Sequence, residues 1–169
     1  DGNLIRAKKK LAEVHRAGQV EYVDIGYVGE VESITASVLS DILGEGYIPV
    51  VAPVGVGEGG ESYNINADYV AAKVAGALQA EKLLLLTDVE GIYENYADKS
   101  SFISSLTGKE ARRYIDEGII SGGMIPKVES CLCALAEGTK KACIIDGRLS
   151  HSLLLELFTA QGIGTEIVR

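Results

Sequence analysis

The sequence has few of the residues that bind metals or form covalent cross-links. Among its 169 residues are three cysteines and two histidines, and no two cysteines have the Cys-x-x-Cys spacing. This small, odd set argues against a zinc site and against a disulfide framework. Cys131 and Cys133 lie two apart on a predicted helix, so they point in different directions. We interpret these two and Cys143 as small apolar residues in a reducing cytosol, and we predict no metal ligands.

Long apolar runs and dense basic clusters are also absent. No run reaches the length that spans a membrane, and no secretory signal opens the sequence. The net charge is −8, and the one basic run, residues 6–10, is typical of a solvated strand or helix face. We therefore expect neither a membrane nor a nucleic-acid partner. Hydrophobic residues at 47% and charged residues at 24% are typical of an ordinary soluble globular protein, and the length favours one domain, or one and a half. Together with the reducing cytosol inferred from the cysteines, this leads us to expect a cytoplasmic protein.

The stretch 63–93 holds the densest set of candidate site residues. Asn64, Asn66 and Asp68 crowd the predicted start of a helix over residues 67–79. This helix carries apolar residues at three- and four-residue spacing, which gives it one buried stripe. Anions bind favourably at helix N-termini, so this start is one candidate ligand site.

A predicted strand follows this helix. Residues 83–86 are four leucines without alternation, which is typical of a strand covered on both faces inside a parallel sheet. The strand ends in Thr87 and Asp88, and Gly91 follows. Because ligands of open α/β sheets bind at the carboxyl ends of strands, we take this end as the second part of the site.

The first part of the chain favours strands. Residues 4–9 and 20–28 predict two strands of a hairpin-rich region, with a turn at 16–19. Residues 33–35 begin a helix, and residues 47–54 predict a buried strand bounded by prolines.

Residues 55–60 match the pattern Gly-x-Gly-x-x-Gly. In a dinucleotide-binding fold the last glycine opens a helix directly, so that the pyrophosphate meets the helix N-terminus. Here residues 61–68 separate the motif from the next settled helix. We therefore reject the dinucleotide interpretation and predict a turn or hairpin.

In the second half, predicted strands alternate with helices, which favours a parallel sheet with right-handed crossovers. The polar run 94–101 predicts a turn, and Thr107 with Glu110 forms a capping box for the next helix. A glycine-rich loop at 119–127 leads into another helix. The remaining predicted elements are a strand at 141–145, a helix at 151–158 and a strand within 162–167.

Two features of this half carry chemistry. Gly122 and Gly123 let a backbone approach a ligand, and Lys127 stands where a helix begins. On these residues alone, a phosphate site and a plain connection stay equally open, and no Walker A pattern is present. Asp68 is either a partner of its own helix dipole or an organiser of a cation, because it would repel a phosphate directly. Lys127 and a metal ion are the candidate cations.

Four segments resemble the acetylglutamate kinases, a group within the amino acid kinase family. They are Asn-Ile-Asn-Ala-Asp at 64–68, Leu-Thr-Asp-Val-Glu-Gly-Ile at 86–92, Ser-Gly-Gly-Met-Ile-Pro-Lys at 121–127 and Ile-Ile-Asp-Gly-Arg at 144–148. The resemblance implies a three-layer αβα sandwich with a mainly parallel central sheet. It further implies a partial amino-acid-substrate lobe at 1–80 and a complete nucleotide lobe at 81–169.

The resemblance also implies an activity. It is the ATP- and Mg²⁺-dependent phosphorylation of the side-chain carboxylate of N-acetyl-L-glutamate, a transferase step of arginine biosynthesis. A carboxylate of this kind has a pKa of about 4.3, so no general base is needed and charge cancellation is the main task. On this basis Asp68 and Lys127 are expected to be catalytic, and Asn64 and Asn66 to bind the substrate. The residues expected to bind the nucleotide are Asp88, Val89, Gly91, Ile92, Tyr93, Ser121, Gly122, Gly123 and Met124.

One departure from the family pattern stands out. A strand leading to a lysine and a glycine-rich loop, a second glycine pair and a substrate-binding arginine are expected before Asp1. We therefore expect this chain to be part of a longer protein and to be inactive alone. Two alternatives stay open: a kinase for N-acetyl-aminoadipate, and a non-catalytic nucleotide-binding or regulatory module. A homo-oligomer, and a response to arginine or to a PII-type protein, are also compatible with the resemblance.

Overall fold

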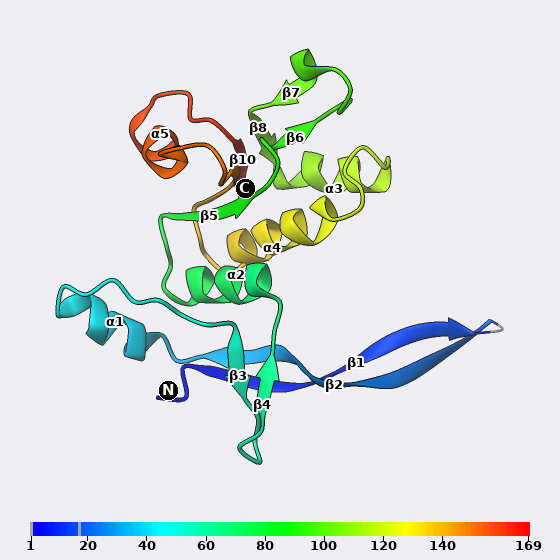
Figure 1. Cartoon of the computed structure of the whole chain (residues 1–169), viewed down its shortest axis with the longest axis vertical. Coiled ribbons are helices and arrows are strands. Elements are labelled where there is room, and N and C mark those ends of the chain that lie inside the picture. Colours follow the sequence, from blue (N-terminus) through cyan, green and yellow to red (C-terminus); the bar gives the residue numbers. More distant parts are fainter. Residues whose placement is uncertain (1, 17) are drawn as a thin grey trace.

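A long β-hairpin opens the fold. In the computed structural model, which describes residues 2–16 and 18–169, β1 (Ile5–Arg16) pairs antiparallel with β2 (Gln19–Ile34). Both strands extend beyond their predicted lengths, and their paired ends project away from the rest of the molecule (Figure 1). The turn predicted at 16–19 includes position 17, which lies outside the described residues.

The helix predicted to start at 33–35 is α1 (Ala36–Gly44), with Thr35 at its N-cap and Leu39 buried. The buried strand predicted at 47–54 is wrong. Residues 47–53 form no strand, and the side chain of Val50 is 96% exposed. An apolar run becomes a strand only when a neighbouring strand pairs with it. Among the described residues, no strand pairs with residues 47–53.

A short hairpin confirms the prediction for the glycine-rich segment at 55–60. β3 (Val54–Val56) pairs antiparallel with β4 (Ser62–Asn64), and the intervening residues form its turn. β3 also pairs with β1 and β4 with β2, so the four strands close on one another. Their enclosed core consists of Ile5, Ala7, Val31, Tyr63 and Ile65, with Val70 from the following helix.

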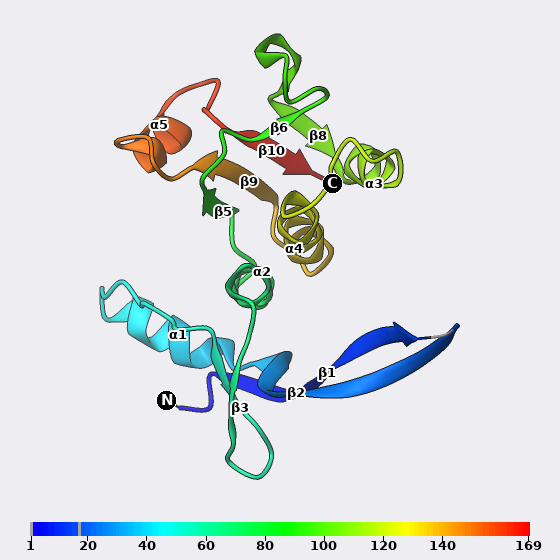
Figure 2. The same ribbon diagram turned by 45° about the vertical axis from the view of Figure 1, so that its right-hand side comes forward.

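That helix, α2 (Ala67–Ala77), lies between the first strands and the rest of the molecule (Figure 2). Val70 packs into the core of the first strands, whereas Ala72 and Ala75 pack into a second, larger core. The predicted apolar stripe is therefore divided between two neighbours. The boundary between a substrate lobe at 1–80 and a nucleotide lobe at 81–169 stays a prediction.

The second core surrounds a four-stranded sheet. Its order is β5 (Lys82–Thr87), β9 (Lys141–Asp146), β10 (Thr165–Val168) and β8 (Ser105–Thr107). β5 runs parallel to β9 and β8 runs parallel to β10, but β10 is antiparallel to β9. The connection from β9 to β10 leaves and re-enters at the same end of the sheet, because Thr165 pairs with Ile144. The sheet is thus mainly parallel, as predicted, with one antiparallel pair between β9 and β10.

Helices cover the sheet on two faces and complete a three-layer αβα arrangement. α4 (Met124–Ala136) packs against β5, β9 and β10 on the same side as α2, and α5 (Ser152–Phe158) packs against β9 from the other side (Figures 1 and 2). α3 (Gly108–Asp116) begins at the predicted capping box of Thr107 and Glu110. The strand at 83–86 is covered less completely than predicted, because Leu86 is 46% exposed.

A small hairpin extends from the end of β5. β6 (Ile92–Tyr93) pairs antiparallel with β7 (Phe102–Ile103), and the 3₁₀ turn η1 (Lys99–Ser101) precedes β7. All three cysteines are free thiols, and Cys131 and Cys143 are buried in agreement with their interpretation as apolar residues. Within residues 2–16 and 18–169, no helix has the length and apolar character needed to cross a bilayer.

Candidate functional site

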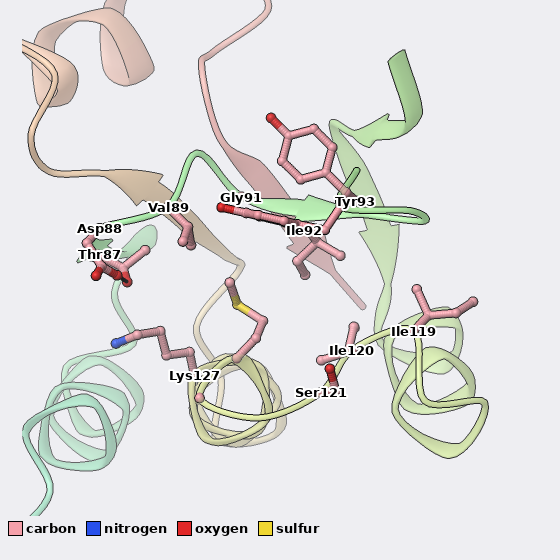
Figure 3. Close-up of a pocket in the computed structure, with 13 residues that line it drawn as sticks. Thr87, Asp88, Val89, Gly91, Ile92, Tyr93, Ile119, Ile120, Ser121 and Lys127 are labelled. Carbon is pink, nitrogen blue, oxygen red and sulfur yellow. Dashed lines mark hydrogen bonds between the residues drawn. The ribbon is translucent and has the colours of Figure 1, made fainter. Parts of the chain in front are cut away.

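A cavity of about 420 Å³ opens at the carboxyl end of β5. One wall is the segment that follows β5, and the other is the loop that leads into α4 (Figure 3). Eight of the nine residues predicted to bind a nucleotide line it, namely Asp88, Val89, Gly91, Ile92, Tyr93, Ser121, Gly123 and Met124, together with Lys127. Gly122 does not line the cavity. The fold thus brings together two segments that are about thirty residues apart.

The first wall is held in place by a buried threonine. The hydroxyl of Thr165 accepts a hydrogen bond from the Ile92 amide at 2.8 Å and donates one to the Ile103 carbonyl at 2.6 Å. Gly91 has a φ of +152°, and a Cβ on it would lie 2.6 Å from that hydroxyl. Glycine is therefore required at this position, because the backbone must pass close to β10 in a conformation that other residues rarely adopt.

The second wall ends in the first turn of α4. Gly122 has a φ of +57°, and Gly123 is the N-cap, so no side chain satisfies the first amides of the helix. The amides of Met124 and Ile125 donate instead to the carbonyls of Ser121 and Gly122, at 3.2 and 3.3 Å. A Cβ placed on Gly123 would meet no atom within 4 Å. The positive end of the helix dipole, with open space before it, suits an anionic group.

Lys127 connects this loop to α2. Its Nζ lies 2.8 Å from Oδ2 of Asp68, and each side chain is 23% exposed. Lys127 comes from the first turns of α4 and Asp68 from the first turn of α2, so the two helix N-termini are joined by an ion pair. Asp68 was interpreted either as a partner of its own helix dipole or as an organiser of a cation. The ion pair with Lys127 supplies the cation that the second interpretation requires.

Neither of the two asparagines predicted to bind substrate lines the first cavity. Asn66 is the N-cap of α2, where its Oδ1 accepts a hydrogen bond from the Tyr69 amide at 3.0 Å. Asn66 also lines a second cavity of about 440 Å³, together with Lys10 and Tyr69. Asn64 ends β4 and is exposed. The capping contact gives Asn66 a structural role that is independent of any ligand.

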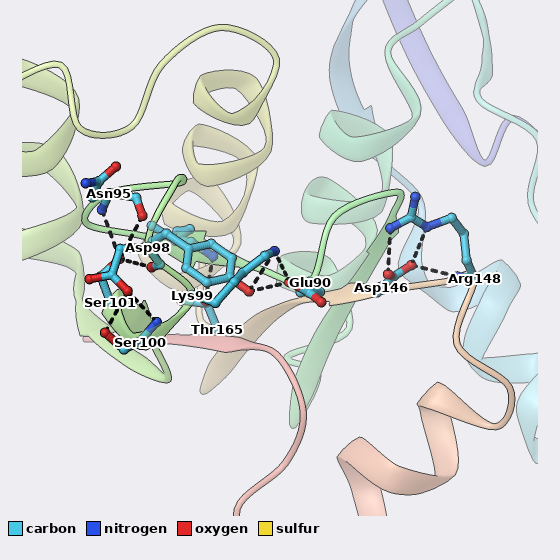
Figure 4. Close-up of polar contacts among 11 residues, drawn as sticks. Glu90, Asn95, Asp98, Lys99, Ser100, Ser101, Asp146, Arg148 and Thr165 are labelled. Carbon is cyan, nitrogen blue, oxygen red and sulfur yellow. Dashed lines mark hydrogen bonds and ion pairs between the residues drawn. The ribbon is translucent and has the colours of Figure 1, made fainter.

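Two ion pairs lie outside the cavity lining, close in sequence or in the sheet to residues that line it (Figure 4). The ammonium of Lys99 and the hydroxyl of Tyr93 hydrogen-bond to Glu90 and lower the pKa of that carboxyl. Arg148 lowers the pKa of Asp146, which it holds through Nη2–Oδ2 at 2.8 Å and Nε–Oδ1 at 3.0 Å. Because Asp146 pairs with Thr87 across the sheet, the segment 144–148 reaches the same strand end as the cavity.

Four cavity residues were not in the predicted set: Thr87, Tyr96, Ile119 and Ile120. Ile119 and Ile120 belong to the glycine-rich loop and Thr87 to the strand end, both of which the sequence did mark. Tyr96 lies in the polar run 94–101, and an aromatic residue in such a run was the signal that could have identified it. Among the described residues, no group of three or more His, Cys, Asp or Glu side chains is arranged to hold a metal ion.

Comparison with known proteins decides the family. The model of the amino acid kinase family matches residues 3–146. This chain belongs to the amino acid kinase family.

The relatives within this family carry a consistent name. The chain is 54% identical over 168 residues to an acetylglutamate kinase of Moorella thermoacetica, and 52% identical over 168 residues to one of Pelotomaculum thermopropionicum. Each match covers 99% of this amino acid kinase chain and 57% of the relative. The chain therefore spans a little over half the length of the curated relatives that it matches.

Solved structures agree on the fold. The N-acetylglutamate synthase from Neisseria gonorrhoeae, complexed with coenzyme A and L-arginine, superposes with a TM-score of 0.82 at 30% identity. That match covers 99% of this chain and 37% of the synthase. The carbamate kinase from Giardia lamblia bound to AMP-PNP superposes with a TM-score of 0.64 at 19% identity, over 94% of this chain and 52% of that one. At that identity the second match shows the fold alone.

Proposed function

We propose that the protein to which this chain belongs transfers the γ-phosphoryl group of ATP to the side-chain carboxylate of N-acetyl-L-glutamate, a step of arginine biosynthesis. The observation that carries the proposal is the convergence of 88–93 and 121–124 on one cavity, with Lys127 at its edge and Asp68 against that lysine. The names of the relatives at about 50% identity support the choice of substrate.

The residues present suit the charge problem of this reaction. Two anions, a carboxylate and a phosphoryl group, must be brought within about 3–3.5 Å of each other. Lys127 and the positive dipole end of α4 supply positive charge at the cavity. Asp68 restricts the position of Lys127, because an ion pair that is less than a quarter exposed limits the rotamers of the longer side chain.

Magnesium fits the same cavity as a partner of the nucleotide. This ion usually keeps several waters and binds through phosphates and one or two carboxylates. Asp88 lines the cavity at the strand end and is the carboxylate that would hold it. When bound, the ion would neutralise charge on the phosphate groups.

The contacts to the amino-acid substrate are also proposed. Asn66 lines the second cavity and lies two residues before Asp68 in the sequence. Asn64 lies two residues before Asn66. We assign both to N-acetyl-L-glutamate. Assembly into a homo-oligomer, and a response to arginine or to a PII-type protein, stay predictions.

Calorimetric titration of the chain with Mg-ATP tests the nucleotide part of this proposal. Gly123→Val fills the open space before the first amides of α4, so it should weaken ATP binding at least tenfold while the circular dichroism spectrum is unchanged. Gly44→Val is the matched control, since a Cβ at Gly44 also meets no atom within 4 Å but Gly44 lies in α1, outside the cavity. Equal ATP affinity for Gly123→Val and the parent would show that the loop is only a connection.

A chimera tests the phosphoryl transfer. The part of the Moorella thermoacetica relative that lies outside the matched region would be joined to this chain, and ADP release would be measured with N-acetyl-L-glutamate. Turnover that depends on this substrate is expected, and Lys127→Ala should lower kcat far more than it raises KM for ATP. Turnover that is the same with and without N-acetyl-L-glutamate would overturn the substrate assignment.

A further inference from the structure

Tyr96 is an exposed aromatic residue on the wall of the first cavity. Its side chain is 65% exposed, yet it lines the cavity with Tyr93. Tyr22, Tyr27 and Tyr47 have similar exposure but line none of the cavity. Single exposed aromatic rings are common on protein surfaces, so exposure alone does not indicate a binding role for Tyr96. The contacts that hold its ring in place are more informative.

The loop that carries Tyr96 is fixed by its own hydrogen bonds (Figure 4). The Ala97 amide donates to Asn95 Oδ1 at 3.1 Å, and the Ser100 amide donates to Asp98 Oδ1 at 2.9 Å. The hydroxyl of Ser101 donates to the Asn95 carbonyl and accepts from the Asn95 amide, at 2.9 and 3.0 Å. Both residues that flank Tyr96 are therefore bound to the loop, which restricts the backbone beneath its ring.

Neighbouring side chains support the ring itself. Tyr93 meets it edge to face, with centroids 5.7 Å apart and an interplanar angle of 83°. Tyr93 is in turn held by Phe102 at 5.2 Å. Lys99 Nζ lies 5.1 Å from the Tyr96 centroid and 4.5 Å from that of Tyr93. Lys99 thus lies over one face of the Tyr96 ring and Tyr93 fixes its orientation, while 65% of the side chain stays exposed and leaves room for a flat ligand on the ring.

The cavity has two chemically different ends. Figure 3 shows Asp88 and Lys127 at one end and Tyr93, Ile119 and Ile120 towards the other. The phosphate groups of a nucleotide would lie near Lys127 and the start of α4. Tyr96 packs against Tyr93 at the apolar end of the cavity. This end suits a flat and uncharged group.

We propose that Tyr96 is a stacking wall for the nucleobase of ATP, and that it governs affinity for the base and not for the phosphates. This inference rests on the proposed nucleotide binding. Every nucleobase has a π face, and an aromatic ring held in place loses little conformational entropy when a base stacks on it. The hydrogen-bonded loop 94–101 is then the support that keeps the ring in position.

Calorimetry with two probes tests the inference. Mg-ATP carries both base and phosphates, whereas Mg-tripolyphosphate carries phosphates alone. Tyr96→Leu should weaken ATP binding about tenfold and leave tripolyphosphate binding within twofold of the parent, since stacking on one base contributes about 1–3 kcal/mol. Tyr96→Phe should retain ATP affinity within about twofold, because the ring remains. Tyr47→Leu is the matched control, with a tyrosine of similar exposure outside the cavity.

The results separate the stacking role of Tyr96 from the proposed nucleotide site. If the parent binds ATP and Tyr96→Leu binds it equally well, the stacking role is wrong and the proposed function stands. An equal loss of affinity for ATP and for tripolyphosphate would also overturn the stacking role. Tyr96 would then act on the conformation or the charge of the loop and not on the base. A parent chain that binds neither probe would contradict the stacking role and the nucleotide site together.

Discussion

Nζ of Lys127 and Oδ2 of Asp68 lie 2.8 Å apart and join the first turns of two helices that are separated by 59 positions in the sequence. Lys127 lines the cavity at β5, and its neighbour Pro126 lines the second cavity together with Asn66. A group transferred from a nucleotide in the first cavity to an acceptor near Asn66 would therefore pass the Lys127 ammonium.

The first prediction concerns the coupling of this pair. Lys127→Ala and Asp68→Asn should each destabilise the chain, and the double variant should lose less than the sum of the two. We expect a coupling free energy of about 1 kcal/mol from urea unfolding, because the pair is partly shielded from water. Lys140→Ala with Glu81→Gln is the control cycle, since that ion pair is 66% and 75% exposed and should couple by less. Additive losses at Lys127 and Asp68 would reduce Asp68 to a helix-start residue.

The second prediction concerns pH and Glu156. Burial alone would raise the pKa of this carboxyl, but hydrogen bonds from Lys82 and the Ile163 amide lower it overall. The resulting stability is present above the ordinary pKa of 4.5 and is lost as the pH falls through and below that value.

Glu156→Gln should therefore cost about 1–3 kcal/mol at pH 7, since Lys82 loses its buried partner but keeps Glu166, whose Oε1 lies 3.5 Å from its Nζ. The parent should lose stability below pH 4.5 more steeply than this variant does. Guanidinium unfolding at a series of pH values measures both. Parallel pH profiles for parent and variant would contradict the assignment.

The third prediction concerns Thr165. Thr165→Val keeps the shape of the side chain but leaves the Ile92 amide and the Ile103 carbonyl without a partner. We expect a loss of about 1–3 kcal/mol in unfolding free energy, together with weaker ATP binding, because β6 forms part of the cavity wall. Thr139→Val is the control: Thr139 is also fully buried, but its hydroxyl has no partner within the described structure, so this change should be neutral or stabilising. A similar loss in both variants would remove the special role of Thr165.

The fourth prediction concerns thiol reactivity. Burial raises the pKa of Cys131 to about 12, so the thiol is protonated at pH 8 and closed to reagents. We expect Ellman's reagent to label Cys133 first in the native chain, because Cys133 is the half-exposed thiol, and all three cysteines after denaturation. Stability should also fall as the pH rises above 9, where the unfolded Cys131 thiol ionises and the folded one does not. Rapid native labelling of Cys131 would show that its pocket opens.

Local patterns allowed correct predictions wherever the cause of a structure is local. The capping box of Thr107 and Glu110 lies within one helical turn, and the segment 55–60 turns where its glycines permit. The two segments that line the cavity were expected to bind the nucleotide because of the family resemblance. Their local pattern alone left the loop at 119–127 open between a phosphate site and a plain connection.

Non-local pairing limited the rest. The antiparallel direction of β10 depends on where the chain re-enters the sheet, which residues 162–167 do not encode by themselves. The apolar run 47–54 has the composition of a strand, but composition does not supply a neighbouring strand. Tyr96 reaches the cavity only because the hairpin of β6 and β7 folds back on β10 through Thr165.

The position of α2 in both hydrophobic cores has a consequence for how the molecule opens. Val70 is anchored on one side of the helix, and Ala72 and Ala75 on the other. Opening of either core would strip one face of the helix, and a short helix in water is only marginally stable. The amide protons of α2 should therefore exchange with solvent deuterium at the rate set by whichever core opens more readily. Slow exchange in α2 would thus report on both halves of the molecule at once.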